Sequence, residues 1–567
     1  MPTNLASSEP QDIALRAPSE VMRLKRMGSF HQSRLSFMRV LLRRLKHQGW
    51  RFDRPVWRID HRGVGVATYR AIGPERVYTL IAFAHDLPAE QRSDRVIAEA
   101  WDATFTLFDG EPSEDDIVRL SQNVPLQEAG RISASELVLS RANRSVRLFE
   151  YVIDCLARGL QPATEMVDPI GYLMRTTAVY GSGKFGAADR DTWAERPEFL
   201  GSFQPELLSV WLIRSFTLDL VEHLAQARAP ETAVLMSPGI RRRLGVGNST
   251  GLGMAPFLLT HPSLIHAWVN ARETALARVR SIQTAAPDKS ILFRNLVARA
   301  AINARNWTSE HPHQSPKIAG LREDLARLSN HLEDHPLEGS QPWNELYLWA
   351  ANTLSLEGQE QLVSLMLEPH GEQIDDLADT MSADESGSFH INGTLPAGIL
   401  KAWLREAYGW ALTTDFESDD AIARVWYVSE EKLEPRLGER FEEPLEAYEQ
   451  PLAPARDAAA MLRSLQEWDD SETIAAFLMK HPEHRHAVRR AQLVAQKPYA
   501  EIRDNTIAAE MLPIDLLRCK LSFFGATKFD PRSDRWVRIT MFQGAPFPEE
   551  LADSDPDDLA YPPEKPL

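Results

Sequence analysis

The chain has 567 residues, of which 43% are hydrophobic and 25% are charged. These proportions are ordinary for a globular protein and exclude a collagen-like repeat, a disulfide scaffold and a wholly disordered chain. At roughly 150 residues per domain, the length allows about three or four domains, or two large ones. The balance of 63 basic and 80 acidic residues gives a net charge of −17, which opposes generic binding to nucleic acid or to anionic lipid.

Cysteine content and apolar runs indicate the compartment. The two cysteines, Cys155 and Cys519, are too few for a secreted disulfide framework. Residues 1–15 lack the basic start and the apolar run of a secretory signal. No run of 18 or more apolar residues is present, so we predict no membrane span. These features predict a cytoplasmic protein in which Cys155 is a small buried hydrophobe.

The N-terminal region combines a polar tail with a basic segment. Residues 1–20 are predicted to be disordered, and residues 21–46 carry eight basic residues and no acid, with apolar residues at helical spacing. The basic residues are Arg23, Lys25, Arg26, Arg34, Arg39, Arg43, Arg44 and Lys46. A basic amphipathic helix either docks on the acidic body of its own protein or binds an acidic partner, a membrane or nucleic acid. Both interpretations stay open at this point.

Two strands are predicted next. Residues 57–69 alternate between apolar and polar side chains, Gly73 and Pro74 mark a turn, and residues 77–84 form a more buried apolar run. This pattern predicts a small antiparallel sheet near the N-terminus. Residues 94–108 are compatible with either a helix or a strand.

Helical patterns dominate the rest of the chain. Ser113 with Asp116, and Ser133 with Glu136, have the spacing of capping boxes, and the second pair predicts a helix that runs to about Arg158. Further helices are predicted at 205–228, 262–282, 289–305, 319–333, 342–368, 396–410, 455–466, 471–480 and 485–510. Later strands are predicted only at 423–428 and 536–542. We therefore predict an α+β fold that is mainly helical, with a large helical middle and few late strands.

Breaks in composition predict five consecutive regions. They are a disordered tail (1–20), a basic helix with an α+β region (21–160), a helical core region with glycine-rich loops (161–380), a mainly helical C-terminal region (381–545) and an acidic, proline-rich tail (546–567). The long apolar helix at 205–228 leaves room for a homodimer without requiring one.

The first glycine-rich motif is Gly181-Ser182-Gly183-Lys184-Phe185-Gly186, with Arg190 shortly after it. Its G-x-G-x-x-G spacing matches the loop that holds a dinucleotide pyrophosphate. No clean apolar strand–helix–strand unit surrounds it in the sequence, and no acid is clearly placed to bind a ribose. We therefore expect either a turn that brings Lys184 and Arg190 toward an anionic ligand, or a purely structural turn.

The second glycine-rich motif follows Arg241-Arg242-Arg243 and runs from Gly245 to Gly253. Its four glycines allow the backbone to curl and to aim several N–H groups at one point, while a following helix N-terminus adds positive potential. The sequence predicts that the substrate is bound by Arg190, Arg243, Gly247, Asn248, Ser249, Thr250 and Gly251. The alternative is a buried crossing in which the glycines allow close packing.

Histidines offer further chemistry. His261 and His266 follow the second motif at the start of a predicted helix, where either could act as a general acid or base. His311-Pro312-His313 and His481-Pro482-Glu483-His484-Arg485-His486 resemble metal ligands, but neither contains the i, i+4 pair of H-E-x-x-H and neither has a clear carboxylate partner. We therefore predict no metal site, and no cofactor is assigned.

Together these features predict a cytoplasmic enzyme that acts on a small anionic metabolite, a carboxylate or a phosphate, held by the glycine-rich loops. Lys184 and His261 are the predicted catalytic residues, and the reaction type stays open. One alternative is a non-catalytic interaction protein that uses the basic helix 21–46. Another is a nucleotide-dependent enzyme that uses the 181–186 loop. The lead hypothesis requires the two glycine-rich loops to meet in space.

Overall fold

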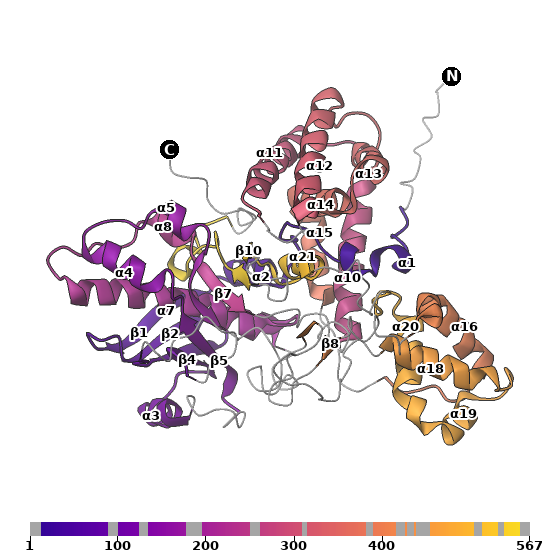
Figure 1. Ribbon diagram of the computed structural model, residues 1–567. Coiled ribbons are helices and arrows are strands. Elements are labelled where there is room, and N and C mark those ends of the chain that lie inside the picture. Colours follow the sequence, from indigo (N-terminus) through magenta and orange to yellow (C-terminus); the bar gives the residue numbers. More distant parts are fainter. Residues whose placement is uncertain are drawn as a thin grey trace. The chain divides into compact units, whose positions relative to one another are not determined.

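The computed structural model describes residues 13–88, 100–123, 134–176, 196–249, 261–308, 315–381, 389–415, 426–427, 436–437, 454–503, 513–530 and 538–555. These residues form two compact units, and each unit is assembled from separate segments of the chain (Figure 1). The first unit takes its described residues from 13–35 and 261–522, and the second from 36–249 and 523–555. The five consecutive regions divide the chain differently and stay a prediction.

The second unit is built on one mixed sheet of nine described strands. They are β1 (Arg51–Ile59), β2 (Gly65–Ile72), β3 (Val77–Ala84), β4 (Ala103–Asp109), β5 (Glu136–Arg144), β6 (Tyr172–Thr176), β7 (Gly245–Ser249), β10 (Lys528–Asp530) and β11 (Arg538–Met541). Their order is β1-β2-β3-β4-β5-β6-β7-β11-β10, and neighbours are antiparallel except β6 and β7, which are parallel. The mainly helical α+β class and the sheet near the N-terminus are confirmed, but the sheet is larger than predicted.

Two of the additional strands are β4 and β5. β4 alternates small or polar residues with large apolar ones, and this alternation identifies the undecided stretch 94–108 as a strand from Ala103 onward. The helix predicted from Ser133 is wrong over β5, which is buried along its whole length between β4 and β6. Pairing in the middle of a sheet outweighed the local capping signal there. The helical part of that prediction is only α4 (Phe149–Ala157).

The described helices of this unit are α2 (Phe37–His47), α3 (Glu114–Asn123), α4, α5 (Thr164–Val167), α7 (Gln204–Arg228) and α8 (Pro238–Arg242). Two of them, α7 and α3, pack on opposite faces of the sheet. α7 is apolar nearly all round, as expected of a buried helix, and it lies against the sheet through Phe216, whose ring centre is 5.5 Å from that of Phe105 on β4. On the opposite face, Ile117 and Leu120 of α3 pack on Ile81 and Leu139.

The capping box that opens α3 is confirmed. The N–H of Asp116 donates to Ser113 Oγ at 3.1 Å, and the N–H of Ser113 donates to Asp116 Oδ2 at 3.1 Å. This reciprocal pair satisfies two backbone donors that a helix start otherwise leaves without partners.

The first unit is helical. Its longer helices are α10 (Pro262–Arg280), α11 (Pro287–Arg305), α12 (Ser315–Asp334), α13 (Pro342–Thr353), α14 (Leu356–Leu367), α16 (Ala397–Tyr408), α18 (Pro454–Gln466), α19 (Ile474–Lys480), α20 (Arg485–Gln496) and α21 (Pro513–Phe524). The single helix predicted at 342–368 is two helices, because Ser355 caps α14: its Oγ accepts from the Gly358 N–H at 3.4 Å. The last helix predicted, 485–510, ends with α20 at Gln496.

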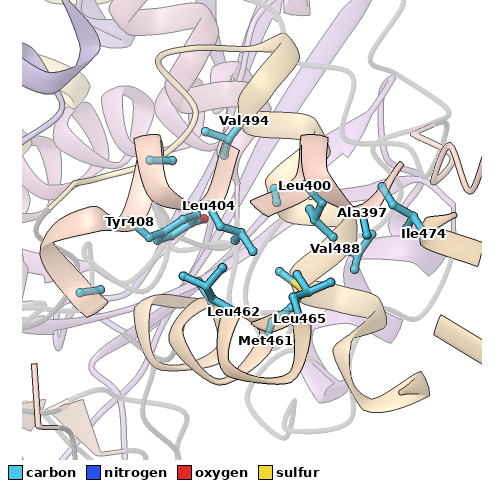
Figure 2. Close-up of a cluster of buried hydrophobic side chains, with 14 of the residues drawn as sticks. Ala397, Leu400, Leu404, Tyr408, Met461, Leu462, Leu465, Ile474, Val488 and Val494 are labelled. Atoms are coloured by element: carbon cyan, nitrogen blue, oxygen red, sulfur yellow. The ribbon is translucent and has the colours of Figure 1, made fainter. Parts of the chain in front are cut away.

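Four of these helices share a core of their own. α16, α18, α19 and α20 enclose a cluster of buried side chains that includes Leu404, Tyr408, Leu462 and Val488 (Figure 2). Tyr408 reaches from this core to Glu501, which is also bound by Arg490. Glu501 is fully buried, so Arg490 compensates its carboxylate charge while the Tyr408 hydroxyl donates a hydrogen bond to it.

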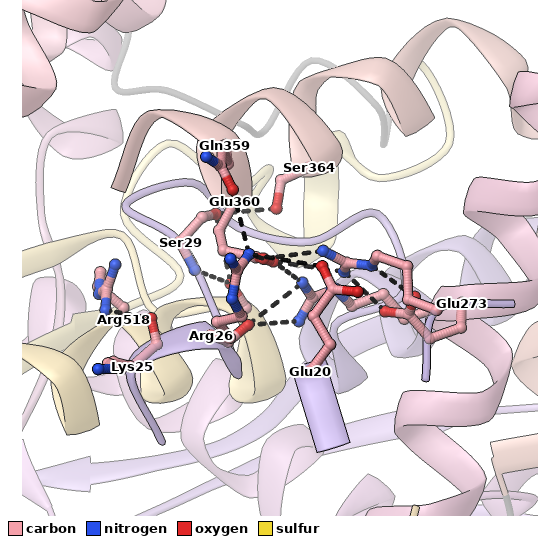
Figure 3. A network of polar contacts seen from close by, with 12 residues as sticks. Glu20, Lys25, Arg26, Ser29, Glu273, Gln359, Glu360, Ser364 and Arg518 are labelled. Carbon is pink, nitrogen blue, oxygen red and sulfur yellow. Dashed lines mark hydrogen bonds and ion pairs between the residues drawn. The ribbon is translucent and has the colours of Figure 1, made fainter. Parts of the chain in front are cut away.

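The N-terminal segment enters the first unit through ion pairs. Arg16 is buried and donates from Nε to Glu273 at 2.8 Å and from Nη1 to Glu360 at 2.9 Å. Glu360 also pairs with Arg272 and with Arg26, the latter at 3.2 Å (Figure 3). Three guanidinium groups therefore surround two buried carboxylates. This arrangement ties residues 13–26 to α10 and α14.

The basic segment 21–46 is not one continuous helix. It contains a short 3-10 helix (Leu24–Arg26) and α2, and the two lie in different units. Within the first unit, Arg26 pairs with Glu360, and Arg34 Nη2 pairs with Asp375 at 2.7 Å. These contacts agree with the interpretation that the segment docks on acidic groups of its own protein.

Candidate functional site

The parallel pair of strands, β6 and β7, locates the two glycine-rich motifs. Tyr172 pairs with Gly245, and Thr176 pairs with Asn248. The carboxyl ends of the two strands therefore lie at the same edge of the sheet. In the sequence, β6 is followed by the 181–186 motif and β7 by residues 250–253. In open α/β sheets, ligands bind beyond the carboxyl ends of neighbouring parallel strands. The predicted site residues Lys184, Arg190, Thr250 and Gly251 lie outside the described residues.

The connection from β6 to β7 is a strand–helix–strand unit. α7 lies between the two parallel strands in the chain and packs on the sheet that contains them. The inference that no such unit surrounds the 181–186 motif is thus wrong. Two features still differ from a dinucleotide-binding turn: α7 begins only at Gln204, well after Gly186, and its first turn carries Glu206. An acid at a helix N-terminus disfavours a phosphate there.

The first half of the second motif is a strand rather than a curl. β7 lies between β6 and β11, so its backbone takes part in the sheet. A Cβ built on Gly245 would lie 2.2 Å from the carbonyl oxygen of Met541, and one on Gly247 would lie 2.8 Å from the ring of Tyr172 and 2.9 Å from Arg175 Cγ. These two glycines allow close packing. Their binding role stays a prediction.

Arg243 already has a carboxylate partner. It is 4% exposed, and its Nη1 lies 2.9 Å from each carboxylate oxygen of Asp168. The neighbouring Arg241 and Arg242 pair with Glu549 at 3.0 Å and Glu550 at 2.9 Å. The three arginines therefore hold two segments, the loop between α5 and β6 and the C-terminal segment. A substrate anion would have to compete with these carboxylates.

The two predicted histidines lie at the start of α10. His261 is its N-cap residue and is half-buried. His266 Nδ1 accepts a hydrogen bond from the N–H of Tyr499 at 3.2 Å, and the two rings stack. Burial, aided by the charge of Lys497, lowers the pKa of His266 to about 4. His266 is therefore a neutral acceptor that holds the segment after α20, whereas the catalytic role of His261 stays a prediction.

A polar row on one sheet face was missed by the sequence reasoning. Thr104 pairs with Arg141, Asn143 pairs with Arg175, and Arg175 pairs with Gly247 across β4 to β7. Directly opposed residues share a face, so Arg141 and Arg175 lie on the face away from α7. Arg175 is the residue before Thr176, the last residue of β6. Arg141 is the residue before Ala142, which pairs with Thr176. Asn248, opposite Thr176, belongs to the face that α7 covers.

The described surroundings of Arg141 include polar and aromatic groups. Thr104 Oγ1 lies 2.9 Å from Nε2 of the half-buried His85, and the Arg141 guanidinium lies 5.3 Å from the ring centre of Trp101. Burial lowers the pKa of His85, against the opposing effect of Asp102. Both arginines are about one-twentieth exposed, at 5% and 6%. Guanidinium groups in such surroundings match the fork geometry of carboxylates and phosphates.

The period-2 pattern of β4 was the signal that could have revealed this row. Thr104 and Thr106 alternate with Phe105 and Leu107, which marks two different faces of one strand. Once β4 is a strand, the stretch that contains Arg141 becomes a candidate partner.

Compared with known family models, curated proteins and solved structures, the chain has no significant match. Among the described residues, no helix is both long and apolar enough to cross a bilayer.

Proposed function

We propose that the protein is a cytoplasmic enzyme whose substrate is a small anionic metabolite, a carboxylate or a phosphate, bound where the chain leaves β6 and β7. The observation that carries this proposal is the parallel pairing of the two strands. It supports the requirement that the two glycine-rich loops meet in space, because the carboxyl ends of the two strands are adjacent.

Charge supports the same location. Arg141 and Arg175 share one sheet face on adjacent strands, and diagonal neighbours in a sheet lie about 7–8 Å apart. One anion of two or more oxygens can contact both guanidinium groups at that separation. In this proposal the two arginines hold the anion, and Lys184 is the catalytic residue that the sequence analysis predicted.

The strand–helix–strand connection favours a nucleotide as one form of this anion. A nucleotide presents the same phosphate chemistry to Arg141 and Arg175, and the G-x-G-x-x-G motif follows β6 directly. The late start of α7 and the acid in its first turn argue against a standard dinucleotide turn. Inorganic phosphate, pyrophosphate, citrate, ATP and NAD therefore make up the test panel.

The experiment is a calorimetric binding titration of the full chain with this panel at constant ionic strength, which removes general salt effects. The variants R141Q and R175Q remove one guanidinium each. The matched control is R70Q, because Arg70 lies on the same sheet but is bound on the surface by Asp53 and Glu111. We expect at least one anion to bind the wild type and R70Q, and to bind both test variants at least tenfold more weakly.

Two results contradict the proposal. One is the absence of binding by every member of the panel. The other is an anion whose affinity is unchanged in R141Q and R175Q. A companion variant, K184A, separates binding from chemistry, since it should keep the bound anion while it loses turnover of the substrate class so identified.

A further inference from the structure

The junction between α19 and α20 gathers two histidines and a glutamate. His481 ends α19, and Glu483 and His484 lie on the single 3-10 turn that leads into α20. One ligand atom from each of these residues lies within 4.8 Å of the other two. Within the described part of the chain, this is the one group of three histidine, cysteine or acidic side chains with that spacing.

Two histidine nitrogens converge on one carboxylate oxygen. His481 Nδ1 lies 3.1 Å from Glu483 Oε1, and His484 Nε2 lies 3.9 Å from the same oxygen. Two ligand atoms of a tetrahedral metal with bonds of about 2.0–2.2 Å lie roughly 3.3–3.6 Å apart, so the first separation has to widen slightly and the second has to shorten slightly. Glu483 and His481 are 59% and 26% exposed at their side chains, so both can make this small adjustment.

Aromatic packing orients the two imidazole rings. The His484 ring lies parallel to Phe477, at 1° with centres 5.8 Å apart, and the His481 ring lies 5.1 Å from the same phenylalanine. Trp468 lies edge-on to His481 with ring centres 6.0 Å apart. Rings held in this way lose little freedom when they bind a ligand, which favours a preorganised site.

We propose that His481 Nδ1, Glu483 Oε1 and His484 Nε2 form a binding site for a divalent first-row transition metal, with zinc as the preferred ion. Two imidazoles and one carboxylate are a known zinc ligand set that leaves a fourth position for water. The same donors disfavour magnesium, which prefers oxygen ligands only. This site lies in the four-helix group, and it neither uses nor requires the anion proposed for the sheet.

The sequence reasoning rejected this motif because it lacks an i, i+4 histidine pair and a clear carboxylate. A 3-10 turn aligns side chains three residues apart, as His481 and His484 are, and the Glu483 side chain contacts His481 Nδ1 at 3.1 Å. Glu483 is the missing carboxylate.

Ser464 sets the expected strength of binding. Its Oγ lies 2.9 Å from His484 Nε2, the atom that the metal would take. Metal binding therefore replaces this hydrogen bond, and the hydroxyl becomes available to a metal-bound water. We expect moderate affinity rather than the very tight binding of a four-ligand structural site.

The experiment uses the full chain without an affinity tag, after dialysis against a chelator. Co²⁺ is the spectroscopic probe, Zn²⁺ is the competitor and Mg²⁺ is the negative control. The test variants are H481A and E483Q, whose side chains are partly exposed, so the core should stay folded. H486A is the matched control, because His486 lies two residues further along, is exposed and belongs to no such group.

We expect one equivalent of Co²⁺ to give visible absorption in the wild type and in H486A, and Zn²⁺ to displace it. H481A and E483Q should bind Co²⁺ at least tenfold more weakly, and Zn²⁺ should raise the melting temperature of the wild type and H486A only. Absence of saturable binding overturns the proposal, as does equal affinity in H481A and H486A. Neither outcome bears on the anion proposal, whose variants lie in the other unit.

Discussion

The buried ion network around Arg16 makes a sharp prediction about how the N-terminal segment stabilises the first unit. The change is R16M, which keeps most of the apolar stem and removes the guanidinium. Arg16 donates to Glu273 twice, each time at 2.8 Å, and to Glu360 at 2.9 Å. Removing one partner of a buried ion pair typically costs about 3–5 kcal/mol, because the other charge stays buried without compensation. We expect a loss in that range.

The pH dependence of stability is a second test of the same network. Burial alone would raise the pKa of Glu360, but the charges of Arg16, Arg272 and Arg26 outweigh it and lower the pKa from 4.5 to about 2. That difference corresponds to about 3 kcal/mol at roughly 1.4 kcal/mol per pKa unit. Because the folded-state pKa is the lower one, this stabilisation is present above about pH 4.5 and is lost as the pH falls toward 2.

The assay is native-state hydrogen exchange of the α10 amides, because unfolding of a chain with two units is not a single transition. The matched control is R278M. Arg278 lies on the same helix, but its pair with Asp376 is exposed, at 41% and 63%, and such pairs contribute at most about 1 kcal/mol. R16M should lower the opening free energy of α10 by several times the effect of R278M. Equal effects of the two variants would refute the reasoning.

Three further predictions follow from single residues. G247A should lower the melting temperature, at a cost of about 1–3 kcal/mol, because the new Cβ meets Tyr172 at 2.8 Å, whereas G239A meets nothing within 4 Å and should be neutral. Burial lowers the pKa of His266 to about 4, so stability is complete above about pH 6.5 and declines as the pH falls toward 4; an H266Q variant should lose that part of the acid sensitivity in urea titrations. Burial raises the pKa of Cys519 to about 12, so this thiol should resist alkylation in the folded protein and react once urea unfolds it, as peptide mass spectrometry would show.

Local patterns predicted the helices well where a helix is long or capped. α7 was predicted within one residue at each end because its apolar residues leave no other element possible over that length. Ser113 and Asp116 predicted the start of α3 because both halves of a capping box are local. The break at Ser355 was missed, since a serine within a continuous apolar pattern is weak evidence against one helix.

Local sequence patterns could not predict the pairing of strands that lie far apart in the chain. β6 and β7 are separated in the chain by α7, and β11 lies some three hundred positions further along. No local pattern predicts that Gly245 lies close to the backbone of Met541. The glycines of β7 looked like a loop because glycine weakens a strand. The structure shows the other reason for a glycine in a strand, the close approach of a neighbouring chain.

The error over β5 carried into the candidate site, because the period of an element decides which side chains share a face. In the helix predicted there, Arg141 and Arg144 would be three apart and would point the same way. In the strand they point in opposite directions. Arg144 lies over the ring of Phe149, 4.5 Å from its centre, while Arg141 shares its face with Arg175 on the next strand. One change from helix to strand thus replaces a pair of arginines on one segment with a pair on two neighbouring strands, near the carboxyl end of β6. Where a segment is compatible with both a helix and a strand, an anion site should therefore be sought with both periodicities before arginines are assigned to one face.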